Sequence, residues 1–351
     1  MKRAQVLAYR WSLHGFGGPP DDALLTLGVQ DSNVGSAALA LSARGLPSSR
    51  LVTVWSFRGA PHLHRAASLP TLSRALWPLS DADALARLAG LGTTLRKARL
   101  SGLDAIAATA DAVRHVVTKP TAKGDVSAAV TQRIDGAYSS WCRGCGATHV
   151  HDQLLRLAAF HGGVRNDGAA PVTFAPIPRW PGVPSSASGT DALVTAYLTL
   201  HGPATPADAG GFLGSTGANV RPAWPDALAE VVVDGRKTWL PAPSLDALDG
   251  APAAKGVRLL PPSDPYLQMR DRALLVPDAA HRKALWTILA SPGALVVDGE
   301  VAGTWRAKGT GRLVVTVTPF GALTARTRSA IDDEAARVAD VRGATSYEVA
   351  Y

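Results

Sequence analysis

Apolar residues recur at helical spacing in three short segments near the N-terminus, with polar or glycine-rich residues between them. The spacing predicts helices over Leu7–His14, Asp22–Leu27 and Gly35–Arg44. A run rich in β-branched and aromatic residues, Leu51–Phe57, then predicts a strand. The N-terminal region therefore begins with three helices that lead into a strand.

A repeat follows, because Pro120 and Asp125 have the same spacing as Pro203 and Asp208. Each proline lies in a polar turn, after a helix-like apolar pattern and before an Ala-rich segment whose Asp suits the start of a helix. Both copies therefore predict a helix, a turn and a second helix. A third periodic segment comes next in each copy, at His151–Phe160 and at Pro222–Ala229.

Val231–Val233 and Lys237–Leu240 flank an Asp234-Gly235 turn, which is a strong hairpin signal. Three helices closed by a basic hairpin describe a winged helix. The simplest interpretation is a tandem of winged-helix (helix-turn-helix) units over residues 1–100, with a connecting helix, 101–180 and 181–245.

After a Pro- and Ala-rich linker, Pro241–Ala254, the pattern changes to alternating strands. Strands are predicted over Ala294–Val297, Glu300–Trp305 and Arg312–Thr318, and an amphipathic helix over Ser329–Val341. The expected fold class is α+β, with the tandem winged-helix units followed by a small β-rich C-terminal domain over residues 255–351.

Hydrophobic residues make up 46% of the chain and charged residues 18%, which is typical of a folded globular protein. No apolar run reaches the roughly 18 residues of a membrane span, so we expect a cytoplasmic protein with no membrane contact. The net charge is +8, and most of the excess lies in residues 1–120. Such a balance suggests a polyanionic partner, and solubility charge is the alternative. No P-loop, dinucleotide glycine motif or nucleophile elbow is present, so we expect no nucleotide cofactor.

Gln30, Asp31, Ser32 and Asn33 form a dense polar cluster between two apolar segments. One interpretation is the N-cap of the following helix, which favours Asp, Ser and Asn. The other is a polar site held between rigid helices.

A basic segment, Arg58 to Arg65, follows the first predicted strand. Arg58 and Arg65 suit phosphate contacts, and plain wing surface is the alternative. Alternation places His62 and His64 on one face, but a metal pair there has no evident third ligand.

Both cysteines of the chain lie in one loop with two histidines: Cys142, Cys145, His149 and His151. Thiolate and imidazole ligands suit tetrahedral zinc, although the spacing is shorter than in usual zinc fingers. A possible structural zinc and a glycine-rich turn with reduced cysteines both stay open. A zinc module that recruits protein partners is a further hypothesis.

The chain resembles the winged-helix DNA glycosylases of the AlkZ and YcaQ type, which unhook alkylated nucleotides and interstrand crosslinks. The resemblance spans nearly the whole chain. The stretches that carry it are Leu27–Arg44, Arg58-Gly59 with His62, Leu259–Arg272, Val297–Gly299 and Gly303–Arg306.

In that family a Gln, one apolar residue and then Gln or Asp form the catalytic pair. Gln30 fits the first position, whereas the second falls on Ser32 and the middle one is Asp31. The resemblance implies that Gln30 orients a water and that Asp31 or Ser32 helps to polarise it. A branch that binds DNA without cutting the glycosidic bond is the alternative.

The leading hypothesis is a DNA glycosylase that acts on bulky N-alkylated purines or interstrand crosslinks in duplex DNA, as a monomer and with no cofactor for catalysis. An alkylated purine leaves as a neutral base, so little acid catalysis is needed. The rival hypothesis is a non-catalytic winged-helix DNA-binding protein, a regulator or lesion binder. The expected DNA contacts are Arg58, His62, Arg65, Arg236, Lys237, Asp298, Gly299 and Arg306.

Overall fold

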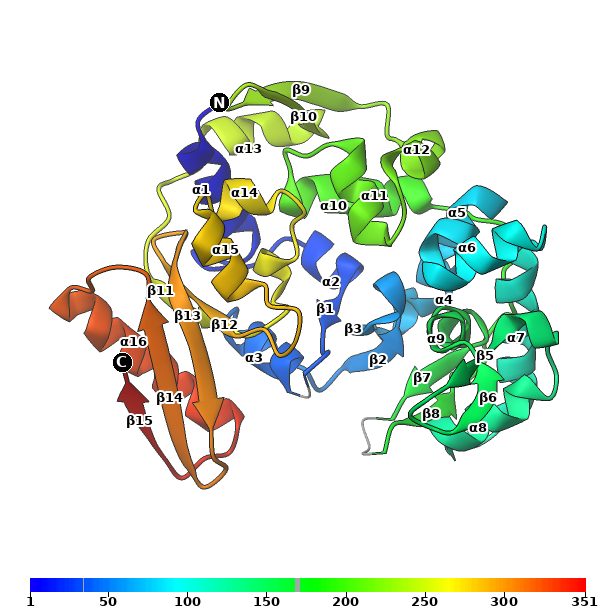
Figure 1. The fold of residues 1–351 in the computed structure, drawn as a ribbon. Helices are drawn as coiled ribbons and strands as arrows, with labels where there is room; N and C mark the ends of the chain where they lie inside the picture. The colour runs from blue at the N-terminus through cyan, green and yellow to red at the C-terminus, as the bar shows by residue number, and fades with distance from the viewer. Residues whose placement is uncertain (34, 168–170) are drawn as a thin grey trace. The chain divides into compact units, whose positions relative to one another are not determined.

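The computed structural model describes residues 1–33, 35–167 and 171–351. The chain packs as two units, each built from segments that are distant in the sequence (Figure 1). Unit 1 comprises residues 1–49, 195–205 and 226–351, and unit 2 comprises residues 50–194 and 206–225. Helix α10, Thr190–His201, is divided between them.

Unit 1 combines N-terminal helices with a hairpin and the C-terminal sheet. Its helices include α1 (Arg3–Leu13), α2 (Ala23–Leu27), α3 (Ser36–Ser42), α13 (Leu245–Asp249), α14 (Arg272–Leu275), α15 (Ala279–Leu285) and α16 (Ala325–Val341). Its strands include β1 (Val29–Gln30), β9 (Leu228–Val233), β10 (Arg236–Pro241), β11 (Val257–Leu260), β12 (Gly293–Val297), β13 (Glu300–Lys308), β14 (Arg312–Pro319) and β15 (Ser346–Ala350).

The C-terminal sheet has the strand order β11-β12-β13-β14-β15, antiparallel except for the parallel pair β14–β15. Leu313, Val315 and Val317 alternate along β14 and are fully buried. They pack in one core with the apolar face of α16, which lies along the sheet in Figure 1. The mixed α+β class and the predicted C-terminal strands and helix are confirmed.

Two Asp-Gly turns join neighbouring strands. Asp234-Gly235 connects β9 to β10, and Asp298-Gly299 connects β12 to β13. All four residues have positive φ, between 46° and 82°. Positive φ at both central positions is the type I′ geometry that matches the twist of antiparallel strands, which explains why Asp-Gly predicts these hairpins.

Unit 2 is built around an antiparallel sheet whose strands pair in the order β3-β2-β7-β8-β4. Its strands include β2 (Leu51–Trp55), β3 (Pro61–Arg65), β4 (Thr121–Ala122), β5 (Ser139–Cys142), β6 (Ala147–Val150), β7 (Val164–Asn166) and β8 (Thr173–Pro176). Its helices include α4 (Leu69–Leu76), α5 (Asp81–Arg87), α6 (Gly90–Lys97), α7 (Gly102–Val116), α8 (Lys123–Thr131), α9 (Asp152–His161), α11 (Pro206–Leu213) and α12 (Gly217–Val220).

Helix α7 illustrates how local sequence forms these elements. Ser101 caps it by accepting a hydrogen bond from the backbone N–H of Asp104 at 3.1 Å. Ile106, Ala110 and Val113 recur at helical spacing and are buried. Ile106 and Val113 share a core with residues of α8, α9 and β2. Helix α7 is therefore held by its cap and by one apolar face.

The predicted helices on either side of the two turns are present, α7 and α8 in one copy and α10 and α11 in the other. The third helix predicted over Pro222–Ala229 is wrong. The helical residues come earlier, in α12 and a 3-10 turn over Arg221–Ala223, and Leu228 already belongs to β9. Pro222 and Pro225 interrupt the apolar pattern, because proline lacks the backbone N–H that a helix interior needs.

Within the described ranges, we find no helix with the length and apolar character that crossing a bilayer requires.

Candidate active site and nucleic-acid interface

The polar cluster predicted around Gln30 begins where β1 ends in unit 1. Val29 is fully buried, whereas Gln30 is half-buried and Ser32 is exposed. The Gln30 side chain donates from Nε2 to Ser32 Oγ at 2.6 Å. The first and third residues of the predicted catalytic motif are therefore in direct contact, at the surface of the unit.

Asp31 faces the following helix. Its Oδ1 accepts hydrogen bonds from the backbone N–H of Ala37 at 2.9 Å and from the Ser36 hydroxyl at 3.2 Å. These groups belong to the first turn of α3, whose N–H groups have no partner within the helix. The N-cap residue of α3 is Gly35, so Asp31 is not the predicted N-cap, although its carboxylate accepts from the first turn of the helix. Its carboxylate is engaged in stabilising α3.

A pocket of about 190 Å³ in unit 1 adjoins the end of the cluster. Asn33 and Ser36 line one part of it, and Arg306 and Trp305 of β13 line another. Arg306, one of the expected DNA contacts, therefore shares a pocket with a residue of the polar cluster.

A loop beside this pocket presents two apolar side chains to solvent. Ile288 is 101% exposed and Leu289 is 83% exposed. The loop is held by a hydrogen bond from Thr287 Oγ1 to the Leu289 carbonyl at 2.8 Å, and by one from Arg306 Nη2 to the Ala290 carbonyl at 2.7 Å. The loop thus holds two adjacent apolar side chains in solvent. The sequence analysis did not identify it.

Helix α3 is fixed at its other end by a buried ion pair. The Arg44 guanidinium bonds Asp264 through both nitrogens, at 2.7 and 2.9 Å, and also donates to the Ala40 carbonyl at 2.6 Å. Both side chains are fully buried. A bidentate pair of this kind fixes orientation as well as charge. Asp264 also accepts from the backbone N–H of Tyr266, so the C-terminal motif positions the helix that follows the polar cluster.

A second buried pair joins Arg10 of α1 to Asp271, at 2.7 and 3.1 Å. Arg10 is fully buried and also donates to the Gly202 carbonyl at 3.0 Å. His14 lies nearby, and burial, followed by His201 and Arg44, holds the pKa of its imidazole well below the usual value. Asp264 and Asp271 thus each form an ion pair with a buried arginine.

Arg58 and His62, both expected DNA contacts, are engaged inside unit 2. Arg58 donates to the Phe212 carbonyl, and its guanidinium lies 5.0 Å from the centre of the Phe212 ring. His62 is 2% exposed and its Nδ1 donates to the Ala60 carbonyl at 2.9 Å. Burial, followed by the charge of Arg58, holds the pKa of His62 well below its usual value. These contacts give both residues a structural role.

The other expected DNA contacts lie at surface positions or in turns. Arg65 is exposed at the end of β3 in unit 2. In unit 1, Lys237 pairs with Glu230 across the β9–β10 hairpin at 3.1 Å, and Arg236 contacts Thr205 Oγ1 at 3.2 Å.

The turn at Asp298 and Gly299 is anchored from within unit 1. Asp298 Oδ1 accepts from the Gly256 N–H at 2.7 Å, and the Gly299 carbonyl accepts from the buried Tyr266 hydroxyl at 2.9 Å.

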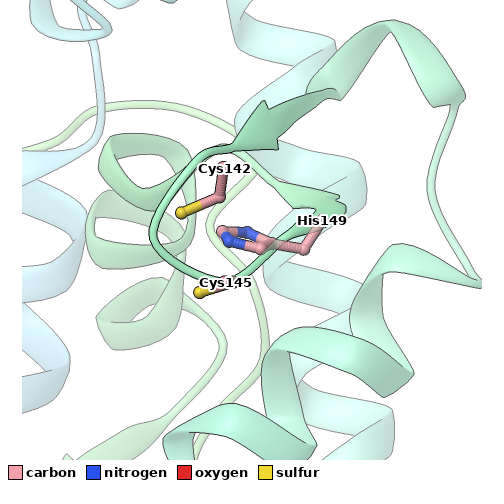
Figure 2. A group of neighbouring side chains, drawn as sticks. All are labelled: Cys142, Cys145 and His149. Carbon is pink, nitrogen blue, oxygen red and sulfur yellow. The ribbon is translucent and has the colours of Figure 1, made fainter.

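Three of the four predicted metal ligands gather at the tip of the β5–β6 hairpin (Figure 2). The ligand atoms of Cys142, Cys145 and His149 all lie within 4.8 Å of one another. His151 stands outside this group and is half-buried.

The pKa values of the two thiols in this cluster shift in opposite directions. A hydrogen bond with His149, followed by bonds to the Cys145 and Gly144 amides, lowers the pKa of Cys142 to about 7. The neighbouring Cys142 raises the pKa of Cys145. Hydrogen bonding to the Val150 carbonyl, then to Cys142, raises the pKa of His149.

The protein class follows from comparison with known families. The profile of the family described as DNA glycosylase AlkZ-like matches residues 33–341, and the chain belongs to this family. The matched range begins just after Ser32, so the family assignment does not depend on the three predicted catalytic residues.

One curated sequence and one solved structure, both from Streptomyces sahachiroi, are similar to this chain. The interstrand DNA cross-link repair glycosylase of Streptomyces sahachiroi is 31% identical over 182 residues, which are 48% of this chain and 47% of that protein. The match thus spans about half the length of this curated relative. The solved structure of the S. sahachiroi DNA glycosylase AlkZ has a TM-score of 0.74 over 99% of both chains, at 21% identity, so the fold is shared.

Proposed function

We propose that the protein is a DNA glycosylase that hydrolyses the N-glycosidic bond of bulky N-alkylated purines, including those in interstrand crosslinks, in duplex DNA. The observation that carries the proposal is the Gln30 amide, held at the surface by Ser32 in a member of the AlkZ-like family. The name of the S. sahachiroi relative supports crosslinks as the substrate.

The chemistry requires a positioned water and little else. N-alkylation makes the purine a cationic leaving group that departs as a neutral base, so no strong general acid is needed. In our proposal the Gln30 carbonyl oxygen accepts a hydrogen bond from the attacking water and so positions it. Ser32 orients the amide through its hydrogen bond with Nε2.

We assign the second catalytic position to Ser32 and not to Asp31. The Asp31 carboxylate bonds two groups in the first turn of α3 and would have to leave them to act on a water. A serine supplies no negative charge near the oxocarbenium-like sugar. We therefore expect activity on lesions whose glycosidic bond is already weakened.

The pocket lined by Asn33 and Arg306 is the proposed place where the DNA backbone beside the damaged nucleotide docks. Arg306 supplies positive charge for the DNA backbone. The exposed Ile288 and Leu289 are the proposed contacts with the face of a base pair or the sugar edge. Bulky adducts can be attacked without full base flipping, since a deep pocket would not admit them.

For DNA binding we propose winged-helix units. Within unit 2, helices α7, α8 and α9 precede the β7–β8 hairpin, which is the order of a winged helix with the β5–β6 hairpin inserted between α8 and α9. Of the expected basic contacts, exposed Arg65, Arg236 and Lys237 suit phosphate groups best.

The test is base release by the wild-type protein from a duplex with one N7-alkylguanine and from a crosslinked duplex. Enzymatic release leaves an abasic site, which heating in alkali converts to a strand break. We expect breaks at the lesion in proportion to time and enzyme, and none in undamaged duplex. Absence of breaks from both lesions would refute the glycosylase proposal.

A non-catalytic lesion-binding protein is the second candidate, favoured by the serine in place of Gln or Asp at position 32. It predicts tight, salt-sensitive binding of DNA by the wild type with no abasic product. Gln30→Ala would then leave every measured property of the complex unchanged.

A further inference from the structure

We propose that Cys142, Cys145 and His149 form a zinc site at the tip of the β5–β6 hairpin, with a water as the fourth ligand. The site lies in unit 2, whereas the proposed catalytic residues belong to unit 1. Its existence is therefore independent of the proposed glycosylase activity.

The hairpin register brings the first and last of these ligands together. Cys142 pairs with Ala147, and His149 lies two residues beyond Ala147 on the same strand. Because side chains alternate along a strand, Cys142 and His149 point to the same face of the hairpin. The turn between the strands then returns Cys145 to this face, as Figure 2 shows.

The turn itself has a conformation that suits this return. Gly146 has φ 62°, a left-handed value that glycine adopts without strain. Its N–H donates to the Cys142 carbonyl at 2.9 Å and closes the turn. The two sulfurs thus converge through backbone geometry, with only Arg143 and Gly144 between their residues.

The distances are close to those of a tetrahedral site. Zn–S bonds of about 2.3 Å and Zn–N bonds of about 2.0–2.1 Å place ligand atoms roughly 3.4–3.8 Å apart. The observed separations, all within 4.8 Å, need only a small inward rotation of the side chains. Two thiolates and a neutral imidazole balance the charge of Zn²⁺, and binding releases the protons of the two thiols.

His149 has the orientation of a metal-binding histidine. Its Nδ1 donates to the Val150 carbonyl at 2.8 Å, since a carbonyl oxygen can only accept. That bond fixes the tautomer that leaves the Nε2 lone pair for a metal. His151 differs, because it lies outside the ligand group.

The tip of the hairpin is the part that such a link would hold. The base of the hairpin is already packed, because Val150 is buried in the core of unit 2 and its N–H donates to Thr131 Oγ1 at 2.8 Å, whereas Cys145 at the tip is exposed. Trp141, next to the first cysteine, is 67% exposed, so apolar packing of this side chain adds little. A metal would connect both strands and the turn at one point.

The test uses the full chain, produced without an affinity tag in zinc-supplemented medium and purified under reducing conditions. Elemental analysis should find about one zinc per chain. Cys145→Ser and His149→Gln should each weaken zinc binding by more than about 100-fold. This is a larger loss than mutation of a residue that only hydrogen-bonds a metal ligand causes. The matched control His151→Gln should keep the metal. Zinc-free wild type, or equal loss from His149→Gln and His151→Gln, would overturn the proposal.

Cobalt provides a readout that does not depend on the folding of a variant. Co²⁺ added to the chelator-stripped, reduced wild type should give a thiolate charge-transfer band and the intense visible bands of a four-coordinate ion. Zinc should displace the Co²⁺, which abolishes these absorption bands, and should protect the two thiols from alkylation. Thiols that react at the same rate with and without zinc would contradict the site. Base release plays no part in these measurements, so failure of the proposed function leaves them interpretable.

Discussion

At the scale of single residues, the adjacent side chains from Gln30 to Asn33 make different contacts. Gln30 and Ser32 bond each other at the surface, Asp31 bonds the first turn of α3, and Asn33 lines a pocket. Asp31 is therefore bonded to the helix, whereas a catalytic role for Gln30 and Ser32 stays a prediction. The local composition identified the polar cluster. Only the side-chain directions show which of its residues bonds the helix and which lie at the surface.

The first prediction compares Asp31→Ala with Ser32→Ala. Loss of the Asp31 carboxylate leaves the Ala37 N–H and the Ser36 hydroxyl without this acceptor, so the free energy of unfolding should fall by about 0.5–2 kcal/mol. Ser32→Ala removes an exposed hydroxyl, so stability should stay within about 0.5 kcal/mol of the wild type while base release slows. Urea denaturation and the abasic-site assay measure the two effects. The reverse order of stabilities would contradict the roles assigned here.

A second prediction concerns pH. His161 of α9 is buried beside Ser73 and Trp77, and burial, followed by the charge of Arg87, lowers its pKa to about 3. The unfolded state binds this proton near pH 6.5, so the stability contribution is complete above pH 6.5 and is lost as the pH falls toward 3.

His161→Asn should reduce the dependence of unfolding free energy on pH by up to about 1.4 kcal/mol per pH unit below pH 6.5. Asn can keep a hydrogen bond with Ser73 but does not titrate. Denaturant titrations between pH 7 and pH 5 give the slope. A variant with the wild-type slope would show that His161 does not carry this linkage.

At the scale of elements, α3 connects the polar cluster to the C-terminal motif. Asp31 bonds its first turn, and Arg44, which pairs with Asp264, bonds a carbonyl near its end. The structural role of the Pro261–Asp264 stretch is to supply a buried carboxylate, that of Asp264, to Arg44, which is far away in the sequence.

The third prediction is that Asp264→Ala lowers the free energy of unfolding by about 3–5 kcal/mol, since it leaves the Arg44 charge buried without its partner. Glu230→Ala, which breaks the exposed pair with Lys237, is the control and should cost at most about 1 kcal/mol. Calorimetry or urea denaturation distinguishes the two. Similar losses from both variants would refute the structural importance of the buried pair.

The two Asp-Gly turns give a fourth prediction through matched substitutions. Gly235 and Gly299 have φ of 82° and 81°, so alanine should cost about 1–2 kcal/mol at either site. A Cβ at Gly299 would also lie 2.8 Å from Ala254 Cβ, whereas no described heavy atom lies within 4 Å of one at Gly235. Gly299→Ala should therefore be the less stable variant in thermal unfolding. Equal melting temperatures would contradict this difference.

Elements with local signals were predictable from the sequence, and long-range partners were not. Alternating strands, Asp-Gly turns and capped helices are encoded by neighbouring residues, so β12–β14 and α16 were found. The partner of Asp264 is Arg44, 220 residues away, and no local pattern points to it. The misplaced third helix arose where prolines interrupt an apolar pattern.

At the scale of the whole molecule, the net charge of +8 suits a DNA-binding protein, and the side chains refine which charges can act. Arg10, Arg44 and Arg87 are buried in ion pairs with aspartates, and they add nothing to the net charge of their surroundings. Exposed residues such as Arg65 therefore carry the proposed electrostatic attraction, whereas Lys237 is paired with Glu230. Sequence counts alone could not make this distinction.

The most direct test of the account is single-turnover base release from an N7-alkylguanine duplex by the wild type and by Gln30→Ala, with enzyme in excess and DNA affinity measured in parallel. We predict that the variant binds the duplex with unchanged affinity and releases the base at least about 100-fold more slowly. Equal rates for the two proteins would contradict the central claim that the Gln30 amide positions the attacking water.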